Sequence, residues 1–140
     1  MREIYPSGRC PRETQQAIAG NTILVAAGEP VSPSQPHFAD HQPYPRTVVA
    51  LDKTGRQLWL VLADGKQLSY SKGVTLQELV AILQRLGVYT ALNLDGGGST
   101  TLVMATPTSS AKTLNAPIQT RVPMRQRPIA THLGFYALPL

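Results

Sequence analysis

Several common protein classes are excluded by what this chain lacks. It has one cysteine, Cys10, among its 140 residues, which excludes an internal disulfide framework and a cysteine-based zinc site. No apolar run approaches the roughly 18 residues of a membrane-spanning helix. Residues 1–10 also lack the apolar core of a secretory signal, and the sequence assigns no compartment. Hydrophobic residues nevertheless make up 42%, enough to bury the core of one domain.

Charge and aromatic content narrow the choice of partner. The formal net charge is +5, which favours anionic partners such as phosphate esters or acidic glycans. The basic residues are scattered and aromatic residues make up only 6%, so we expect no nucleic-acid partner. His37, His41 and His132 show no spacing typical of metal ligands, and we expect no metal and no cofactor.

The order of the expected strands and helix along the chain predicts an α+β domain. Residues 1–20 form an irregular N-terminal segment, and residues 21–140 form the domain, with long loops at 28–45 and 106–126. The turn-rich tetrapeptide Asp52–Gly55 predicts a hairpin. We expect one main helix packed on a mixed β-sheet. The expected strands are 22–27, 47–51, 57–62, 89–94, 100–105 and 129–138.

The clearest helix signal covers residues 76–86. Thr75 is a candidate N-cap, and Glu78 three residues later completes a capping box. Gly87 stands where a C-terminal glycine is common. One face is apolar and is expected to pack on the sheet: Leu76, Leu79, Val80, Leu83 and Leu86.

The strongest motif is Asn93-Leu94-Asp95-Gly96-Gly97-Gly98-Ser99-Thr100. Consecutive glycines suit close backbone approach or positive φ, and successive N–H groups in such a turn can bind an anion. Asp95 and Ser99 add a carboxylate and a hydroxyl. The pattern is neither a Walker motif nor a Gly-x-Ser-x-Gly nucleophile elbow. A tight turn with a structural carboxylate explains it equally well at this point.

Four weaker pieces lie elsewhere in the chain. Arg46-Thr47 follows a proline-rich loop, and an arginine there can bind phosphate in a bidentate manner. Asp64-Gly65 and Ser71-Lys72-Gly73 are typical of turns, and Arg127-Pro128 supplies another cation. Taken singly, each favours a turn or a surface charge.

Taken together and in order, these pieces resemble the phosphodiester glycosidase family. This is the family of the uncovering-enzyme domain, whose bacterial relatives are linked to exopolysaccharide. The resemblance covers residues 20–138 and includes Ser71–Leu79, Ala91–Thr101 and Arg127–Gly134. Family domains usually carry a further upstream stretch, so we expect this chain to match the C-terminal portion of the domain.

The resemblance implies a hydrolase that cleaves a sugar from a sugar-1-phosphodiester, releasing a phosphate monoester. The implied partner is a glycosyl phosphodiester or a phosphorylated polysaccharide. Asp95 is the implied catalytic carboxylate, with Asp64 second. The implied substrate- and phosphate-binding residues are Arg46, Thr47, Ser71, Asn93, Gly96, Gly97, Gly98, Ser99 and Arg127.

Two alternatives stay open at this point. A non-catalytic module could bind phosphorylated or acidic glycans with the same cations and glycine turn. A second copy of the chain could also complete the site. For a shared site, we expect five side chains to line one concavity: Arg46, Asp64, Asp95, Ser99 and Arg127.

Overall fold

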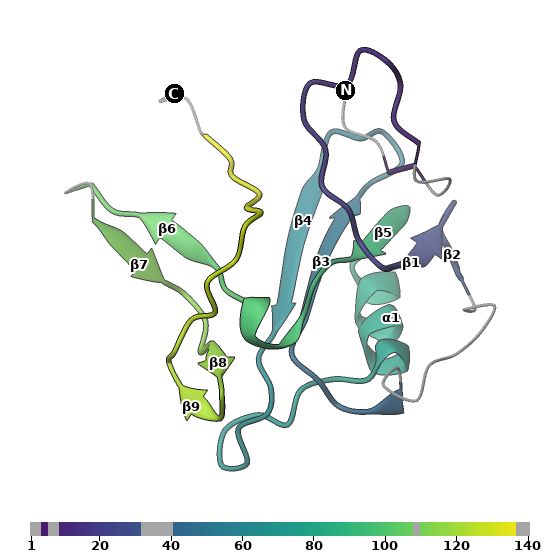
Figure 1. Ribbon diagram of the computed structural model, residues 1–140. Helices are drawn as coiled ribbons and strands as arrows, with labels where there is room; N and C mark the ends of the chain where they lie inside the picture. The colour runs from purple at the N-terminus through teal and green to yellow at the C-terminus, as the bar shows by residue number, and fades with distance from the viewer. Residues whose placement is uncertain (1–3, 6–8, 32–40, 108–109, 137–140) are drawn as a thin grey trace.

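The computed structural model describes residues 4–5, 9–31, 41–107 and 110–136. Its centre is a five-stranded sheet in the order β2-β1-β5-β3-β4 (Figure 1). The α+β class is therefore confirmed. The strands of this sheet are β1 (Thr22–Ala26), β2 (Glu29–Pro30), β3 (Arg46–Leu51), β4 (Leu58–Ala63) and β5 (Thr90–Asn93).

The predicted hairpin is confirmed as β3 and β4. Its register pairs Arg46 with Ala63 and Leu51 with Leu58. The carboxylate of Asp52 closes the turn, accepting hydrogen bonds from the backbone N–H of Gln57 at 2.8 Å and of Thr54 at 3.2 Å. The hydroxyl of Thr54 donates to the same carboxylate. These bonds, led by that of the Thr54 hydroxyl, lower the pKa of Asp52 to about 2.

The predicted helix is confirmed as α1 (Leu76–Arg85). The N–H of Glu78 donates to the Thr75 hydroxyl at 3.2 Å, and the Thr75 N–H donates to the Glu78 carboxylate at 2.8 Å. These reciprocal bonds form the capping box. The hydrogen bonds that the backbone N–H and the hydroxyl of Thr75 donate to the Glu78 carboxylate lower the pKa of Glu78. Leu86 was expected on the buried face, but it caps the helix and is 41% exposed.

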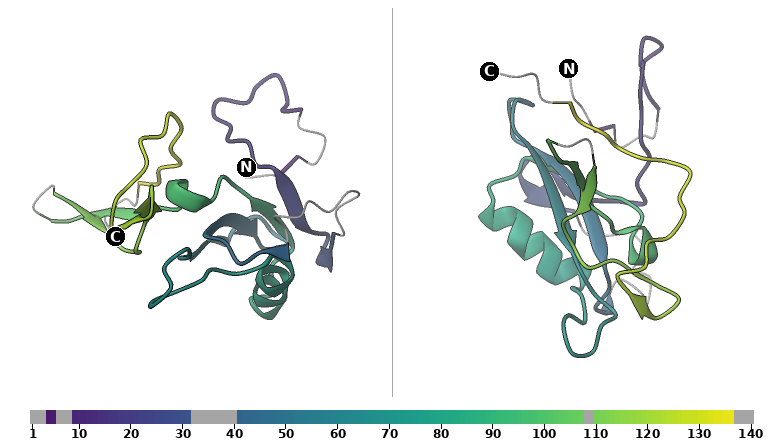
Figure 2. Two further views of the ribbon diagram at one scale, coloured as in Figure 1. Left: turned by 60° about the horizontal axis from the view of Figure 1, so that its bottom comes forward. Right: turned by 90° about the vertical axis from the view of Figure 1, so that its left-hand side faces the viewer.

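The core lies between α1 and one face of the sheet. Figure 2 shows α1 along that face, away from the C-terminal hairpins. None of the helices in the described ranges is long and apolar enough to cross a membrane. The buried core residues are Leu24, Val25, Val48, Ala50, Leu76, Leu79, Leu83, Val88 and Ala91.

The prediction that residues 100–105 form a strand of the main sheet was wrong. They do not join it, because the chain turns after β5 through a short 3₁₀ helix, η2 (Gly97–Ser99). Only Val103–Ala105 (β6) is a strand, and it pairs with Ala111–Thr113 (β7) in a separate hairpin. Every strand pairing in the described residues is antiparallel, whereas a mixed sheet was expected.

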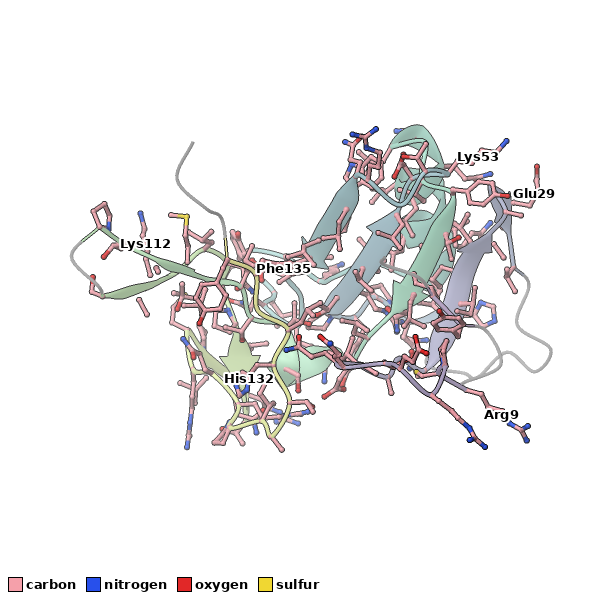
Figure 3. All side chains as sticks on the ribbon, turned by 90° about the horizontal axis from the view of Figure 1, so that it is seen from above. Arg9, Glu29, Lys53, Lys112, His132 and Phe135 are labelled. Carbon is pink, nitrogen blue, oxygen red and sulfur yellow. The ribbon has the colours of Figure 1, made fainter. Side chains whose placement is uncertain are left out.

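The C-terminal third also differs from the expectation. The loop expected at 106–126 contains β7, and then β8 (Ile118–Gln119) and β9 (Val122–Pro123) pair in a small hairpin. The last strand, expected at 129–138, is absent from the part described, and residues 137–138 lie outside it. Figure 3 instead places His132 and Phe135 on a segment that runs back beside these hairpins. Phe135 and Tyr136 are exposed, so the segment gains little from apolar burial.

Candidate functional site

The antiparallel ladder brings the predicted site residues to one end of the sheet. Arg46 begins β3 opposite Ala63, the last residue of β4, so Asp64 leaves the sheet at the same end. Asn93, the last residue of β5, pairs with Val48, which lies two residues into β3 from Arg46. The turn that contains Asp95 follows Asn93. The candidates thus share one end of the sheet, but their side chains form three separate clusters.

The first cluster consists of Asp95, Ser99, Gln119 and Arg127, and we call it the Asp95 cluster. The Ser99 hydroxyl donates to Asp95 Oδ2 at 2.6 Å. Arg127 Nη1 donates to Ser99 Oγ at 3.3 Å and lies 3.8 Å from Asp95 Oδ2. Arg127 Nε donates to Gln119 Oε1 at 3.1 Å, which fixes the plane of the guanidinium. A carboxylate, a hydroxyl and a cation therefore meet beside η2.

The charges of this cluster are accessible to a ligand. The side chain of Asp95 is 74% exposed and that of Arg127 is 39% exposed. Their 3.8 Å separation exceeds the roughly 2.7–2.9 Å of a strong charge-assisted hydrogen bond. Exposed pairs of this kind stabilise a protein little, so an incoming anion can displace the carboxylate from the guanidinium at small cost.

The three consecutive glycines are required by close packing. A Cβ on Gly96 would lie 2.5 Å from the carbonyl oxygen of Pro45, and a Cβ on Gly97 would lie 2.8 Å from the hydroxyl of Tyr44. A Cβ on Gly98 would collide with the side chain of Gln119. The N–H of Gly97 donates to the Pro45 carbonyl at 3.0 Å, so it is not free to bind phosphate in this conformation.

Asp64 belongs to a second cluster whose contacts are internal. Its carboxylate accepts from Asn115 Nδ2 at 2.8 Å, from the Ala116 N–H at 2.9 Å and from the Tyr70 hydroxyl at 3.4 Å. Asn115 Nδ2 also donates to the carbonyl of Thr100 at 2.9 Å. Asp64 thereby joins the loop after β4 to the segments on either side of the β6–β7 hairpin.

Arg46 lies in a third cluster, with Tyr44 and Lys66. It is 6% exposed, and its guanidinium donates to the carbonyls of Val74 at 3.4 Å and Gln42 at 3.3 Å. Its Cζ also lies 5.4 Å from the centre of the Tyr44 ring. These contacts place Arg46 beneath the loops, and none of them reaches the Asp95 cluster.

Three more predicted binding residues have partners within the fold. The Thr47 hydroxyl donates to that of Thr100 at 3.2 Å, which anchors the end of the glycine turn. The Ser71 hydroxyl donates to the Asp64 carbonyl at 2.6 Å. Asn93 is 2% exposed, with its amide donating to Asn21 Oδ1 at 2.8 Å and its own Oδ1 unpaired among the described residues. In this conformation their contacts maintain the fold.

Sequence reasoning missed Tyr44, Asn115 and Gln119. Asn115 and Gln119 lie in a segment expected to be a loop, and no local pattern distinguishes them from other polar loop residues. Tyr44 had an indirect signal, because the glycines in the loop before α1 and in the turn after β5 allow another segment of the chain to approach closely. In the described ranges, no three His, Cys, Asp or Glu side chains gather closely enough to hold a metal ion.

Comparison with known proteins identifies similar sequences. The model of the family described as phosphodiester glycosidase matches residues 2–136. N-acetylglucosamine-1-phosphodiester alpha-N-acetylglucosaminidase of Mus musculus is 44% identical over 59 residues, which span 42% of this chain and 11% of the mouse protein. The crystal structure of a hypothetical protein from Synechocystis is 33% identical with a TM-score of 0.48, covering 58% of this chain and 15% of that one. The chain thus matches a small part of the length of each.

Proposed function

The chain belongs to the phosphodiester glycosidase family, and we propose that it hydrolyses a sugar-1-phosphodiester at the bond between the anomeric carbon and the phosphate oxygen. The observation that carries the proposal is the Asp95 cluster. It offers an exposed carboxylate and a partly exposed guanidinium 3.8 Å apart, with a hydroxyl that is hydrogen-bonded to both. Cleavage of a sugar phosphodiester needs these groups, because positive charge develops on the sugar and negative charge on the phosphate as the bond breaks.

Asp95 is the proposed catalytic carboxylate. Breaking the bond at the anomeric carbon passes through an oxocarbenium-like state, which a neighbouring carboxylate stabilises. The same carboxylate can accept a proton from the attacking water. We prefer Asp95 to Asp64 because three donors already occupy the carboxylate of Asp64, whereas that of Asp95 is largely exposed.

Arg127 is the proposed phosphate ligand. Its Nη2 has no hydrogen bond or ion pair within the described residues, and Gln119 holds its Nε. A phosphate monoester is a good leaving group that needs little protonation. A guanidinium that stabilises its growing charge can therefore replace a strong general acid. Ser99 would orient either the water or a sugar hydroxyl, since it lies between Asp95 and Arg127.

Turnover of a chromogenic sugar-1-phosphodiester tests this assignment. Asp95→Asn keeps the shape of the side chain but removes its charge, and we expect kcat to fall by a factor of about 10²–10⁴. Glu29→Gln, which removes an exposed carboxylate on β2, is the matched control and should keep wild-type turnover.

Folding of each variant is checked by circular dichroism, because Asp95 also bonds to Ser99 within the turn. A folded Asp95→Asn protein with unchanged turnover would remove Asp95 from the mechanism. If the wild type binds the substrate without ever cleaving it, the protein is instead a binding module for phosphorylated glycans.

A further inference from the structure

Four glycines from two loops, the one between β4 and α1 and the one after β5, surround the dipeptide Tyr44-Pro45. A Cβ on Gly73 would lie 2.5 Å from the backbone of Tyr44, and a Cβ on Gly65 would lie 2.8 Å from the nitrogen of Pro45. The remaining two are Gly96 and Gly97 of the candidate site, already described. Two separate loops therefore leave out side chains at the positions that this dipeptide fills.

The side chain of Tyr44 is held from two directions. Lys66 Nζ lies 3.9 Å from the ring centre, and the buried Arg46 lies 5.4 Å from it. The backbone of Tyr44 exchanges two hydrogen bonds of 3.2 Å with Val74, next to the cap of α1. The ring is thus fixed to the main sheet and to the helix, with its hydroxyl directed at Gly97.

We infer that Tyr44 is the positioning residue of the site: it holds the glycine turn where Asp95 and Ser99 meet Arg127. The backbone of Gly97 has a φ of 64° and rests against the Tyr44 hydroxyl. Without the Tyr44 ring, the glycine turn loses the contact that fixes its position relative to the sheet. On this account Arg46 supports the site through Tyr44 and does not bind phosphate. The kinetic part of the inference rests on the proposed function, but the packing part does not.

The packing part is tested by two alanine substitutions at matched glycines. Gly97 and Gly87 have nearly equal φ values, 64° and 68°, so alanine meets the same left-handed strain at both. No atom lies within 4 Å of a Cβ at Gly87, whereas the Tyr44 hydroxyl lies at 2.8 Å from one at Gly97. Gly97→Ala should therefore lower the unfolding midpoint by several degrees more than Gly87→Ala. Adding Tyr44→Phe to Gly97→Ala should recover part of that difference.

The positioning part is tested by kinetics on a sugar-1-phosphodiester. Tyr44→Ala should lower kcat by about 10–100-fold, because a displaced turn misplaces the carboxylate. KM should change by less than about 3-fold, since Gln119 still holds Arg127. Tyr44→Phe keeps the ring and should keep kcat within about 3-fold of the wild type.

Each part has a result that overturns it. Equal losses in Gly97→Ala and Gly87→Ala would show that Tyr44 does not contact the turn, whether or not the protein is an enzyme. An active wild type with unchanged kcat in folded Tyr44→Ala would overturn the positioning role and leave the proposed function standing. If the wild type is inactive, the amide NMR signals of residues 95–99 decide, and no shift in Tyr44→Ala would overturn the inference.

Discussion

At the scale of single residues, the carboxylates differ in what their oxygens contact. Those of Asp52 and Glu78 accept hydrogen bonds from a turn and from a helix cap. The carboxylate of Asp64 joins the loop after β4 to the segment after β7. Within the described residues, Asp95 bonds to Ser99 alone and pairs loosely with Arg127, and most of its side chain faces solvent. This contrast is why we assign the chemistry to Asp95.

The internal role of Asp64 gives a stability prediction. Asp64→Ala removes the acceptor of the Ala116 N–H and one of the two acceptors of Asn115 Nδ2, in a partly buried place. We expect the free energy of unfolding to fall by about 1.5–3 kcal/mol, the usual range for hydrogen bonds to a charged group. Urea denaturation measures the loss. A stability equal to the wild type would show that these bonds form in the structure without holding it.

Asp52 gives a prediction about pH. Its pKa lies near 2 in the folded chain against an ordinary value of 3.8, so the folded state binds the proton less readily than the unfolded state. The resulting stabilisation is full above the ordinary value and is lost as the pH falls towards 2. The gap in urea midpoint between wild type and Asp52→Asn should therefore narrow as the pH falls through this range. A gap that stays constant would contradict the cause assigned to the lowered pKa.

At the scale of elements, the sequence predicts those built by local interactions. The capping box and apolar spacing predicted α1, and the Asp52–Gly55 turn predicted the β3–β4 hairpin. Residues 100–105 are rich in β-branched residues, as the strands of the main sheet are, but they do not join that sheet. Thr47 binds Thr100 across 53 positions of sequence, and Asn115 accepts from the N–H of Leu102. Neither contact is visible in a local pattern, because in each case the partner comes from a segment well separated in the sequence.

The packing of α1 is tested by paired truncations on the helix. Leu83 is fully buried against the sheet, whereas its neighbour Ile82 is 39% exposed. Leu83→Ala should lower the free energy of unfolding by about 2–5 kcal/mol. Ile82→Ala, on the same helix, should cost less than about 1 kcal/mol. Losses of equal size in thermal or urea unfolding would mean that the helix presents a different face to the sheet.

At the scale of the whole molecule, the candidate site is assembled from two parts of the chain, the main sheet and the C-terminal segment that follows it. The main sheet supplies Asp95 and Ser99 through the turn after β5, and the C-terminal segment supplies Gln119 and Arg127. Figure 1 shows η2 lying between the sheet and the two small hairpins. Sequence reasoning named three of these four residues. It also placed Arg46 in the same site, because a sequence motif gives no information about burial beneath neighbouring loops.

The central claim is that the Asp95 cluster promotes cleavage at the sugar carbon. Hydrolysis of a sugar-1-phosphodiester in ¹⁸O-labelled water tests it most directly, with mass spectrometry of both products. Attack of water at the anomeric carbon predicts the label in the released sugar and none in the phosphate monoester. Label in the phosphate would mean that water attacks phosphorus, and that result would contradict the mechanism assigned to Asp95 and Arg127.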